Sequence, residues 1–204
     1  MRTFVYVDGF NLYYRALRNT PYRWLDLSKL VRLLLARDNI QQIHYYTARI
    51  TARPGDPDQP TRQQVYLRAL ATIPNLSVTF GQFTTHVRKM PLANDPNKIV
   101  EILRTDEKGS DVNLATHLVY EGAQDEYDTA VVISNDSDLA EPIRIVTQQM
   151  HKKVGVLCPA RYLARELHLY ATFYKPIRPS VLAASQFPQE LQDAHGKFHK
   201  PATW

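Results

Sequence analysis

Short apolar runs alternate along the chain with stretches in which apolar residues recur at helical spacing. The runs predict five strands, at residues 3–7, 43–50, 76–80, 131–133 and 153–157. The fourth run, Val131, Val132 and Ile133, is apolar at every position, which is typical of a strand buried on both faces of a parallel sheet. Strands that alternate with helices predict an α/β fold, here a three-layer sandwich around a central, mainly parallel five-stranded sheet.

Helix start signals stand between these strands. Asp26 is a predicted N-cap followed by apolar residues at i, i+3 and i+4, and Thr61 with Gln64 forms a capping-box pattern. Ser110 is a third predicted N-cap, ahead of a helix that closes near Gly122. Residues 51–60, with three prolines, are predicted as a loop, and residues 81–100 as an irregular crossing.

Proline and scattered polar residues set the last part of the chain apart. We interpret residues 175–204 as a loosely ordered C-terminal extension with a short helix near residues 181–185. The remaining residues 1–174 are predicted to form one domain, which agrees with the 44% hydrophobic content of the 204-residue chain.

The single cysteine, Cys158, excludes an internal disulfide framework and a cysteine-based zinc site, and it suits a reducing compartment. The apolar run at the N-terminus is too short for a signal peptide, and no run is long enough to span a membrane. The sequence therefore predicts a cytoplasmic protein that does not enter membranes.

Charge is unevenly distributed along the chain. Residues 101–150 carry a net charge of −8, whereas the rest of the chain carries +13. A basic surface around an acidic centre is the distribution expected of a protein that binds a polyanion close to a carboxylate-held cation.

Four aspartates occupy positions where elements of the predicted sheet begin or end. Asp8 ends the first strand, Asp136 and Asp138 follow the fourth, and Asp111 lies in the first turn of the helix that begins at Ser110. Capping of helix N-termini accounts for any one of these carboxylates on its own. If the first and fourth strands are neighbours, however, all four face one crevice at the carboxyl edge of the sheet.

Carboxylates gathered in one crevice repel one another and need a compensating cation. Two that approach within about 4 Å repel by on the order of 4 kcal/mol at an effective dielectric constant of 20. A site built from oxygen ligands, without sulfur or histidine, selects a hard divalent cation. We therefore expect Mg²⁺ or Mn²⁺ to be held by Asp8, Asp111, Asp136 and Asp138.

Three segments resemble the NYN domain family, which belongs to the PIN-like nucleases and includes LabA-like proteins. They are YVDGFNL at 6–12, EKGSDVNLA at 107–115 and VISNDSDL at 132–139, and the resemblance extends over roughly residues 3–170. The resemblance implies a PIN-like fold and a metal-dependent ribonuclease whose catalytic and metal-binding residues are the four aspartates. It also implies that Asn11 orders the site, that Ser134 supports the acidic turn formed by residues 134–138, and that Lys108 contacts a phosphate. Arg104 is a further basic candidate for the substrate.

The family often has glycine at the position of Asn135. Because asparagine tolerates left-handed backbone angles, we expect the turn to survive this difference. Tyr13, Tyr14 and Phe83 are candidates for stacking on bases, although aromatic residues in such positions more often belong to the core.

Three functions follow from these patterns. The first is an Mg²⁺- or Mn²⁺-dependent ribonuclease that acts on single-stranded or structured RNA and leaves 5′-phosphate and 3′-hydroxyl ends. The second is an RNA-binding or regulatory module with little catalytic activity, and a homo-oligomer is compatible with either. The third is a phosphatase-like hydrolase, which is disfavoured because no D-x-D motif follows the first strand.

Overall fold

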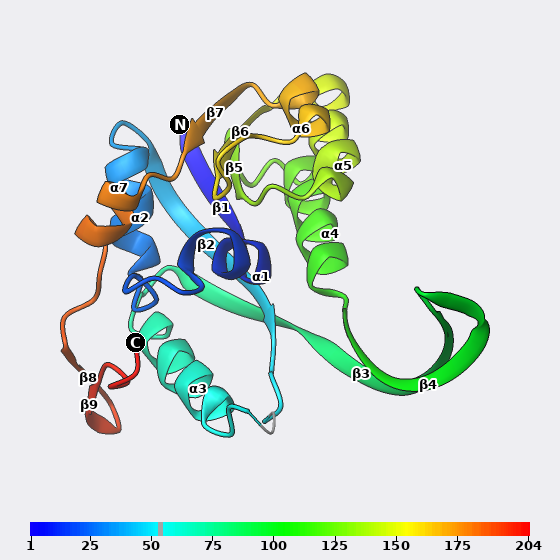
Figure 1. Cartoon of the computed structure of the whole chain (residues 1–204). Coiled ribbons are helices and arrows are strands. Elements are labelled where there is room, and N and C mark those ends of the chain that lie inside the picture. The colour runs from blue at the N-terminus through cyan, green and yellow to red at the C-terminus, as the bar shows by residue number, and fades with distance from the viewer. Residues whose placement is uncertain (53–54) are drawn as a thin grey trace.

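A twisted sheet of seven strands lies at the centre of the computed structural model, which describes residues 1–52 and 55–204 (Figure 1). The strands follow the order β4-β3-β2-β1-β5-β6-β7, and all neighbours pair in parallel except β3 and β4, which are antiparallel. Their bounds are β1 Arg2–Asp8, β2 Asn39–Ala48, β3 Leu76–Leu92, β4 Asp95–Lys108, β5 Thr129–Ile133, β6 Lys153–Cys158 and β7 Phe173–Pro176. The prediction of an α/β protein with a mainly parallel sheet is confirmed, but the number of strands is seven rather than five.

The first strand lies in the middle of the sheet, and the strand order reverses beside it. From β1 the chain adds β2 and β3 on one side, and it returns to pair β5 with the other side of β1. All five residues of β5 are buried, as its unbroken apolar run predicts for a strand covered on both faces. This arrangement creates a switch point between the carboxyl ends of β1 and β5, where open α/β sheets bind their ligands.

Helices cover both faces of the sheet and give the fold three layers (Figure 1). One face carries α1 (Gly9–Leu12), η1 (Tyr13–Leu17), α2 (Leu27–Leu34), α3 (Gln59–Leu70) and α7 (Pro179–Ala184). The other carries α4 (Ser110–Ala123), η2 (Ser137–Leu139), α5 (Ala140–Arg144), η3 (Ile145–Gln149) and α6 (Arg165–Tyr170). Each face has its own hydrophobic core, so the sheet is buried between two apolar layers.

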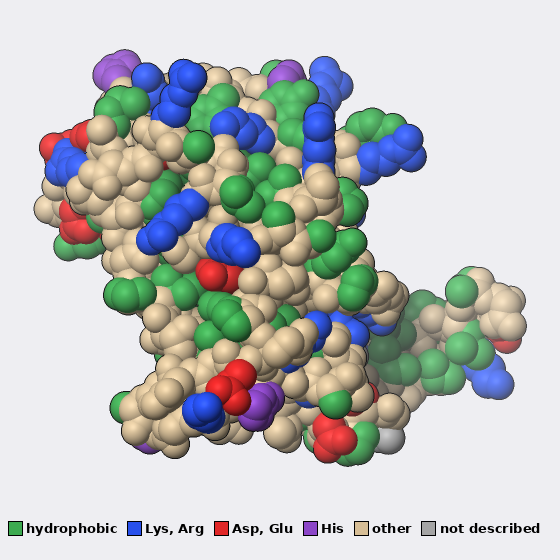
Figure 2. All heavy atoms as spheres, turned by 90° about the vertical axis from the view of Figure 1, so that its left-hand side faces the viewer, with side chains coloured by type: hydrophobic (Ala, Val, Ile, Leu, Met, Phe, Trp, Pro, Cys, Tyr) green, Lys and Arg blue, Asp and Glu red, His purple; other side chains and the backbone are tan. Residues whose placement is uncertain are grey.

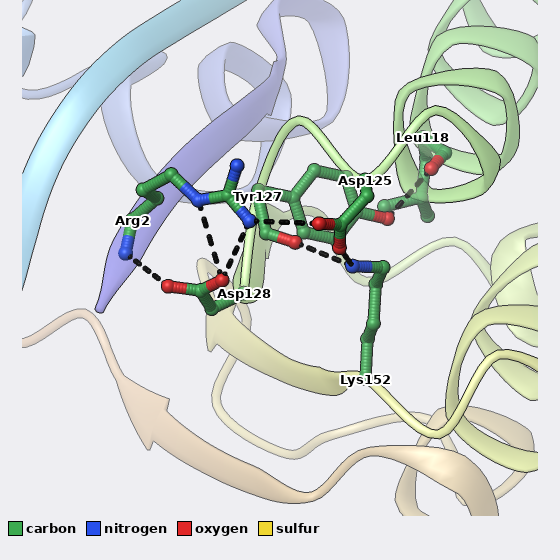
Figure 3. A network of polar contacts seen from close by, with 6 residues as sticks. All are labelled: Arg2, Leu118, Asp125, Tyr127, Asp128 and Lys152. Carbon is green, nitrogen blue, oxygen red and sulfur yellow. Dashed lines mark hydrogen bonds and ion pairs between the residues drawn. The ribbon is translucent and has the colours of Figure 1, made fainter.

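A network of polar contacts joins the start of β1 to the segment before β5 (Figure 3). The backbone N–H and the guanidinium of Arg2 donate to the carboxylate of Asp128, at 2.7 and 2.8 Å, and the guanidinium also reaches Asp125. Lys152 pairs with Asp125 and donates to the backbone oxygen of Tyr127 at 2.7 Å. These contacts connect β1, β5 and β6 at the edge of the sheet opposite to the switch point.

A long β-hairpin, which we call the arm, projects from the edge of the sheet (Figure 1). It consists of the outer parts of β3 and β4, which pair from Gln82 with Lys108 to Leu92 with Asp95. The hydroxyls of Thr85 and Thr105 lie 2.9 Å apart across the two strands. The prediction of an irregular crossing at residues 81–100 is therefore wrong, and β4 adds a strand that the apolar pattern did not indicate.

The C-terminal segment packs onto the rest of the fold. After α7 it forms a second, two-stranded sheet from β8 (Glu190–Asp193) and β9 (Gly196–His199). Trp24 is fully buried, and its ring nitrogen donates to the backbone oxygen of Pro188 at 2.7 Å. Arg68 binds the Asp193 carboxylate through two hydrogen bonds of 2.7 Å. The prediction of a loosely ordered extension is wrong for this segment, although its short helix is present, and the domain boundary at residue 174 stays a prediction.

Basic side chains are spread widely over the face that carries α2 and α7. Figure 2 shows this face, and its Lys and Arg side chains are scattered between apolar and acidic groups rather than gathered into one patch. The charge of this face therefore indicates no single path for a polyanion. In the described part of the chain, no helix combines the length and apolar character that a membrane span requires.

Candidate metal centre

Asp8 lies at the carboxyl end of β1 and caps the helix that follows. Its two carboxylate oxygens accept hydrogen bonds of 2.9 Å, one from the backbone N–H of Asn11 and one from the hydroxyl of Ser134. The residue is 5% exposed, and burial raises the pKa of this carboxyl to about 6 against the two hydrogen bonds, which lower it. The neighbouring carboxylates of Asp111 and Asp136 raise it further.

Asp136 is delivered to the same place by the turn that follows β5. Its backbone N–H donates to the Ser134 hydroxyl at 3.1 Å, and its carboxylate accepts from the backbone N–H of Asp138 at 3.1 Å as the N-cap of η2. Ser134 is fully buried. A single buried hydroxyl therefore joins Asp8 to the backbone of the acidic turn.

Asp111 comes from the opposite side, in the first turn of α4. Gly109 precedes this helix with a φ of +93°, which only glycine adopts without strain, and so turns the chain from β4 into α4. Burial, followed by the charges of Asp136 and Glu107, raises the pKa of the Asp111 carboxyl. The repulsion between these carboxylates is thus already present in the protein alone.

The three carboxylates form one cluster that is suited to a cation. Asp8, Asp111 and Asp136 each place a carboxylate oxygen within 4.8 Å of the others. No ion pair in the described parts of the chain neutralises any of the three. An uncompensated cluster of oxygen ligands is suited to a hard metal cation.

The cluster lies in a cleft of about 830 Å³ that is open to solvent. The cleft is lined by Asp8, Phe10, Asn11, Tyr14, Arg15, Phe83, Thr105, Glu107, Asp111 and Asp136. Arg15 is the one cationic side chain among these lining residues, and Phe10, Tyr14 and Phe83 are the aromatic ones. The cleft therefore combines an acidic centre, one positive charge and an aromatic wall.

The structure brings some of the predicted site residues together and separates others. Asn11 belongs to the cleft, because its side-chain oxygen accepts from the backbone N–H of Asn135 at 3.0 Å and so holds the acidic turn. Asp138 is exposed and lies outside the three-carboxylate cluster. Lys108 and Arg104 do not line the cleft, and Arg104 instead pairs with Asp106 at 2.8 Å. The roles proposed for these three residues stay predictions.

Glu107 and Arg15 were given no role by the sequence patterns, and Asn135 has a different role from the one expected. Asn135 does not have a left-handed backbone. Its side-chain oxygen accepts from the backbone N–H of Ala164 at 2.8 Å, which connects the turn to the segment before α6. Glu107 accepts two hydrogen bonds from Ser110, at 3.1 and 2.8 Å, and adds a fourth carboxylate to the cleft. The position of Glu107 three residues before Ser110 could have indicated this contact. No pattern in the sequence indicated that Arg15 lines the cleft.

Comparison with known proteins gives three results. The NYN domain family matches residues 2–178. The 6-hydroxy-3-succinoylpyridine 3-monooxygenase HspA of Pseudomonas putida (strain DSM 28022 / S16) is 29% identical over an alignment that covers all of this chain and 75% of that protein. A crystal structure of VPA0982 from Vibrio parahaemolyticus RIMD 2210633, a protein of unknown function, superposes with a TM-score of 0.58 at 16% identity, covering 87% of this chain and 93% of that one.

Proposed function

Because the chain belongs to the NYN domain family, a family of PIN-like nucleases, we propose that it is a divalent-metal-dependent ribonuclease that hydrolyses phosphodiester bonds of RNA. The observation that carries the proposal is the cluster of Asp8, Asp111 and Asp136, whose carboxylate oxygens lie within 4.8 Å of one another at the switch point of the sheet. Helix capping requires one carboxylate at each helix end, and it does not explain why three uncompensated carboxylates gather in one open cleft.

Asp8, Asp111 and Asp136 are the residues that would hold the cation. When bound, Mg²⁺ or Mn²⁺ would lower the pKa of water and stabilise negative charge on the phosphoryl oxygens. The hydrogen bonds from Ser134 and Asn11 keep the Asp8 carboxylate fixed in one orientation, as ligand-orienting contacts do in metal sites.

The other side chains of the cleft suit a polyanionic strand. Arg15 is the cationic residue among those that line the cleft, and its guanidinium is the group that would bind a phosphate. Hydrolysis adds water across the phosphodiester bond: the water oxygen bonds to phosphorus, the bond to the 3′ oxygen breaks, and that oxygen takes up a proton. The products are then a 5′-phosphate and a 3′-hydroxyl.

Incubation of the full chain with labelled RNA tests the proposal. Single-stranded RNA, a DNA of the same sequence and a small phosphodiester are compared with Mn²⁺, Mg²⁺ or EDTA, using wild type and Asp136→Asn. We expect RNA cleavage that EDTA and the substitution both abolish. Binding of RNA without cleavage supports the regulatory module instead, and cleavage of the small ester alone overturns the nuclease proposal.

A second candidate activity comes from the relative named as a 6-hydroxy-3-succinoylpyridine 3-monooxygenase. The alignment spans the whole of this chain, and a cavity lined partly by aromatic residues shares Phe10 and Tyr14 with the acidic cleft. In such a reaction one atom of O₂ enters the ring, and the other leaves as water with two protons and two electrons from a reductant such as NADH. Substrate-dependent uptake of O₂ and oxidation of NADH would support this candidate.

A further inference from the structure

The two faces of the arm differ in character. The strands of the arm pair without a register shift from Gln82 with Lys108 to Pro91 with Ile99. Residues directly opposite one another therefore share a face, and successive pairs point to alternate faces. One face, which we call the inner face, carries the pairs Phe83 with Glu107, Thr85 with Thr105, Val87 with Leu103, Lys89 with Glu101 and Pro91 with Ile99. The outer face carries most of the basic side chains of the arm, among them Arg88, Arg104 and Lys108.

Apolar side chains of the inner face are open to solvent. Val87 is 60% exposed, Leu103 76% and Ile99 57%, and Figure 1 shows that the outer half of the arm stands clear of the helices. The pairing of β3 with β2 ends at Gly81, so beyond this residue the arm is a ribbon of two strands. Such a ribbon is at best marginally stable in water. Neighbouring exposed apolar side chains on it indicate a surface that contacts another protein.

The base of the inner face belongs to the acidic cleft. Phe83, Thr105 and Glu107 line the cleft beside the clustered carboxylates. Phe83 and Thr105 also line a groove of about 220 Å³, together with Leu103 and two residues that follow β2. A molecule that covers the inner face would therefore also lie at the mouth of the cleft.

The charge of the arm does not favour a polyanion as this molecule. Residues 82–108 contain five Lys and Arg and four Asp and Glu, a net charge of +1. The inner face has one lysine, Lys89, whose ammonium lies 3.6 Å from the carboxylate of Glu101, and a second glutamate at Glu107. Neutralisation of phosphates by free cationic groups drives the binding of nucleic acids, and the inner face offers no such group. Its apolar centre is suited to a protein partner.

A second copy of the same face is complementary to it. When two inner faces pack antiparallel about a two-fold axis at the pair Val87–Leu103, this apolar pair lies on its own copy. The charged pair Lys89–Glu101 then meets the hydroxyls of Thr85 and Thr105 of the second copy, and Pro91–Ile99 meets Phe83–Glu107. No like charges oppose one another in this register. A shift of the axis by one pair toward the tip would place Lys89–Glu101 on its own copy, where like charges repel.

We propose that the inner face of the arm is the contact surface of a homodimer, in which two arms pack face to face with Val87 and Leu103 at the centre. The tip of each arm then covers Phe83 at the mouth of the partner's acidic cleft, so the second copy completes the wall of each cleft. A face of ten residue pairs is about 33 Å long and about 10 Å wide, and two such faces bury roughly 700–1,000 Å², the size of weak contacts. We therefore expect a dimer that dissociates at micromolar concentrations. This inference does not depend on the proposed ribonuclease function.

Sedimentation equilibrium of the full chain tests the dimer, from low micromolar to several hundred micromolar protein. The mass of wild type should rise from 23.5 kDa toward twice this value. Leu103→Asp should weaken the association by at least about 100-fold, because a symmetric contact loses two buried leucines. Ile102→Asp is the matched control, since Ile102 is the next residue along β4, points to the outer face and is also exposed. A wild-type mass of one chain throughout, or equal effects of the two substitutions, overturns the proposal.

Cross-linking shows whether the inner faces themselves meet. Leu103→Cys and Ile102→Cys are incubated with oxidised glutathione, and Cys158 does not interfere because it is only 2% exposed. A covalent dimer should form in Leu103→Cys, and Val87→Asp in the same chain should suppress it. A dimer in solution without this cross-link would have formed through another surface, which overturns the proposal. Weaker binding of RNA in Leu103→Asp, with wild type monomeric, would assign the inner face to the substrate instead.

Discussion

The hydroxyl of Ser134 donates a hydrogen bond of 2.9 Å to the carboxylate of Asp8, 126 residues earlier in the chain. The same hydroxyl accepts a hydrogen bond of 3.1 Å from the backbone N–H of Asp136. One small buried group thus connects the Asp8 carboxylate at the end of β1 to the backbone of Asp136 after β5. The arrangement of the candidate metal centre therefore includes a residue that is not itself acidic.

Substitution of Ser134 by Ala should weaken divalent metal binding. Removal of a contact that orients a ligand lowers metal affinity by about 10- to 100-fold, and the lost hydrogen bonds should lower the free energy of unfolding by about 1–3 kcal/mol. Calorimetric titration with Mn²⁺ and thermal unfolding measure the two effects. Ser137→Ala, an exposed position in the same turn, is the control. Equal Mn²⁺ affinity in the two variants would show that Ser134 does not orient the site.

Replacement of single aspartates by asparagine should separate ligands from bystanders. In Mn²⁺, we expect Asp8→Asn, Asp111→Asn and Asp136→Asn each to abolish RNA cleavage, because each removes a charge from the three-carboxylate cluster. Asp138→Asn should retain measurable activity, since Asp138 is exposed and outside the cluster. Initial rates with circular dichroism of each variant check this. Loss of activity in Asp138→Asn equal to that in Asp136→Asn would restore Asp138 as a fourth ligand.

The metal-free protein should become less stable as the pH rises from about 4 to above 6. The pKa of Asp8 is raised from 3.8 to about 6 in the fold, so the folded chain holds a proton that the unfolded chain has lost in this range. Its stabilising contribution is present below pH 4 and lost as the pH passes 6, by at most about 3 kcal/mol.

Thermal unfolding of wild type and Asp8→Asn in EDTA isolates this contribution. The stability of wild type relative to the variant should fall between pH 4 and 7, and Mn²⁺ should restore it at pH 7 in wild type only. A difference between the two proteins that does not change with pH would contradict the assignment.

Removal of residues 175–204 should destabilise the fold strongly. The deleted segment covers Trp24, which is fully buried, and supplies the buried side chains Phe187 and Phe198 to the core. Exposure of a large aromatic core residue costs about 3–5 kcal/mol, so we expect Tm to fall by at least about 6 °C. Tyr174→Ala, at a half-exposed position, should leave Tm nearly unchanged. An unchanged Tm in the shortened chain would support a domain that ends at residue 174.

The central strands were predictable because they are buried on both faces, which forces an apolar run in the sequence. The arm was not, because both of its faces meet solvent. Threonine, arginine and lysine therefore stand among its apolar residues, and Val87 and Leu103 are 60% and 76% exposed. Because neither face of such a hairpin is buried, its sequence lacks the apolar pattern that would indicate a strand.

The clustered acids were predictable for a related reason. Asp8 and Asp136 each end a buried strand, and parallel neighbours bring such ends together. The contacts that support them depend instead on tertiary packing: the role of Asn135 requires Ala164, which approaches only when β6 is in place. The tail was missed because its anchoring residues Phe187, Phe198 and Trp204 are spaced without a period.

The order of the strands has a consequence for synthesis on the ribosome. Asp8 is synthesised more than 100 residues before its neighbour strand β5 and the partner carboxylate of Asp136. Until then β1 has one open edge and the acidic group is incomplete. A nascent chain of this design therefore cannot assemble its cation-binding cluster before β5 has been made.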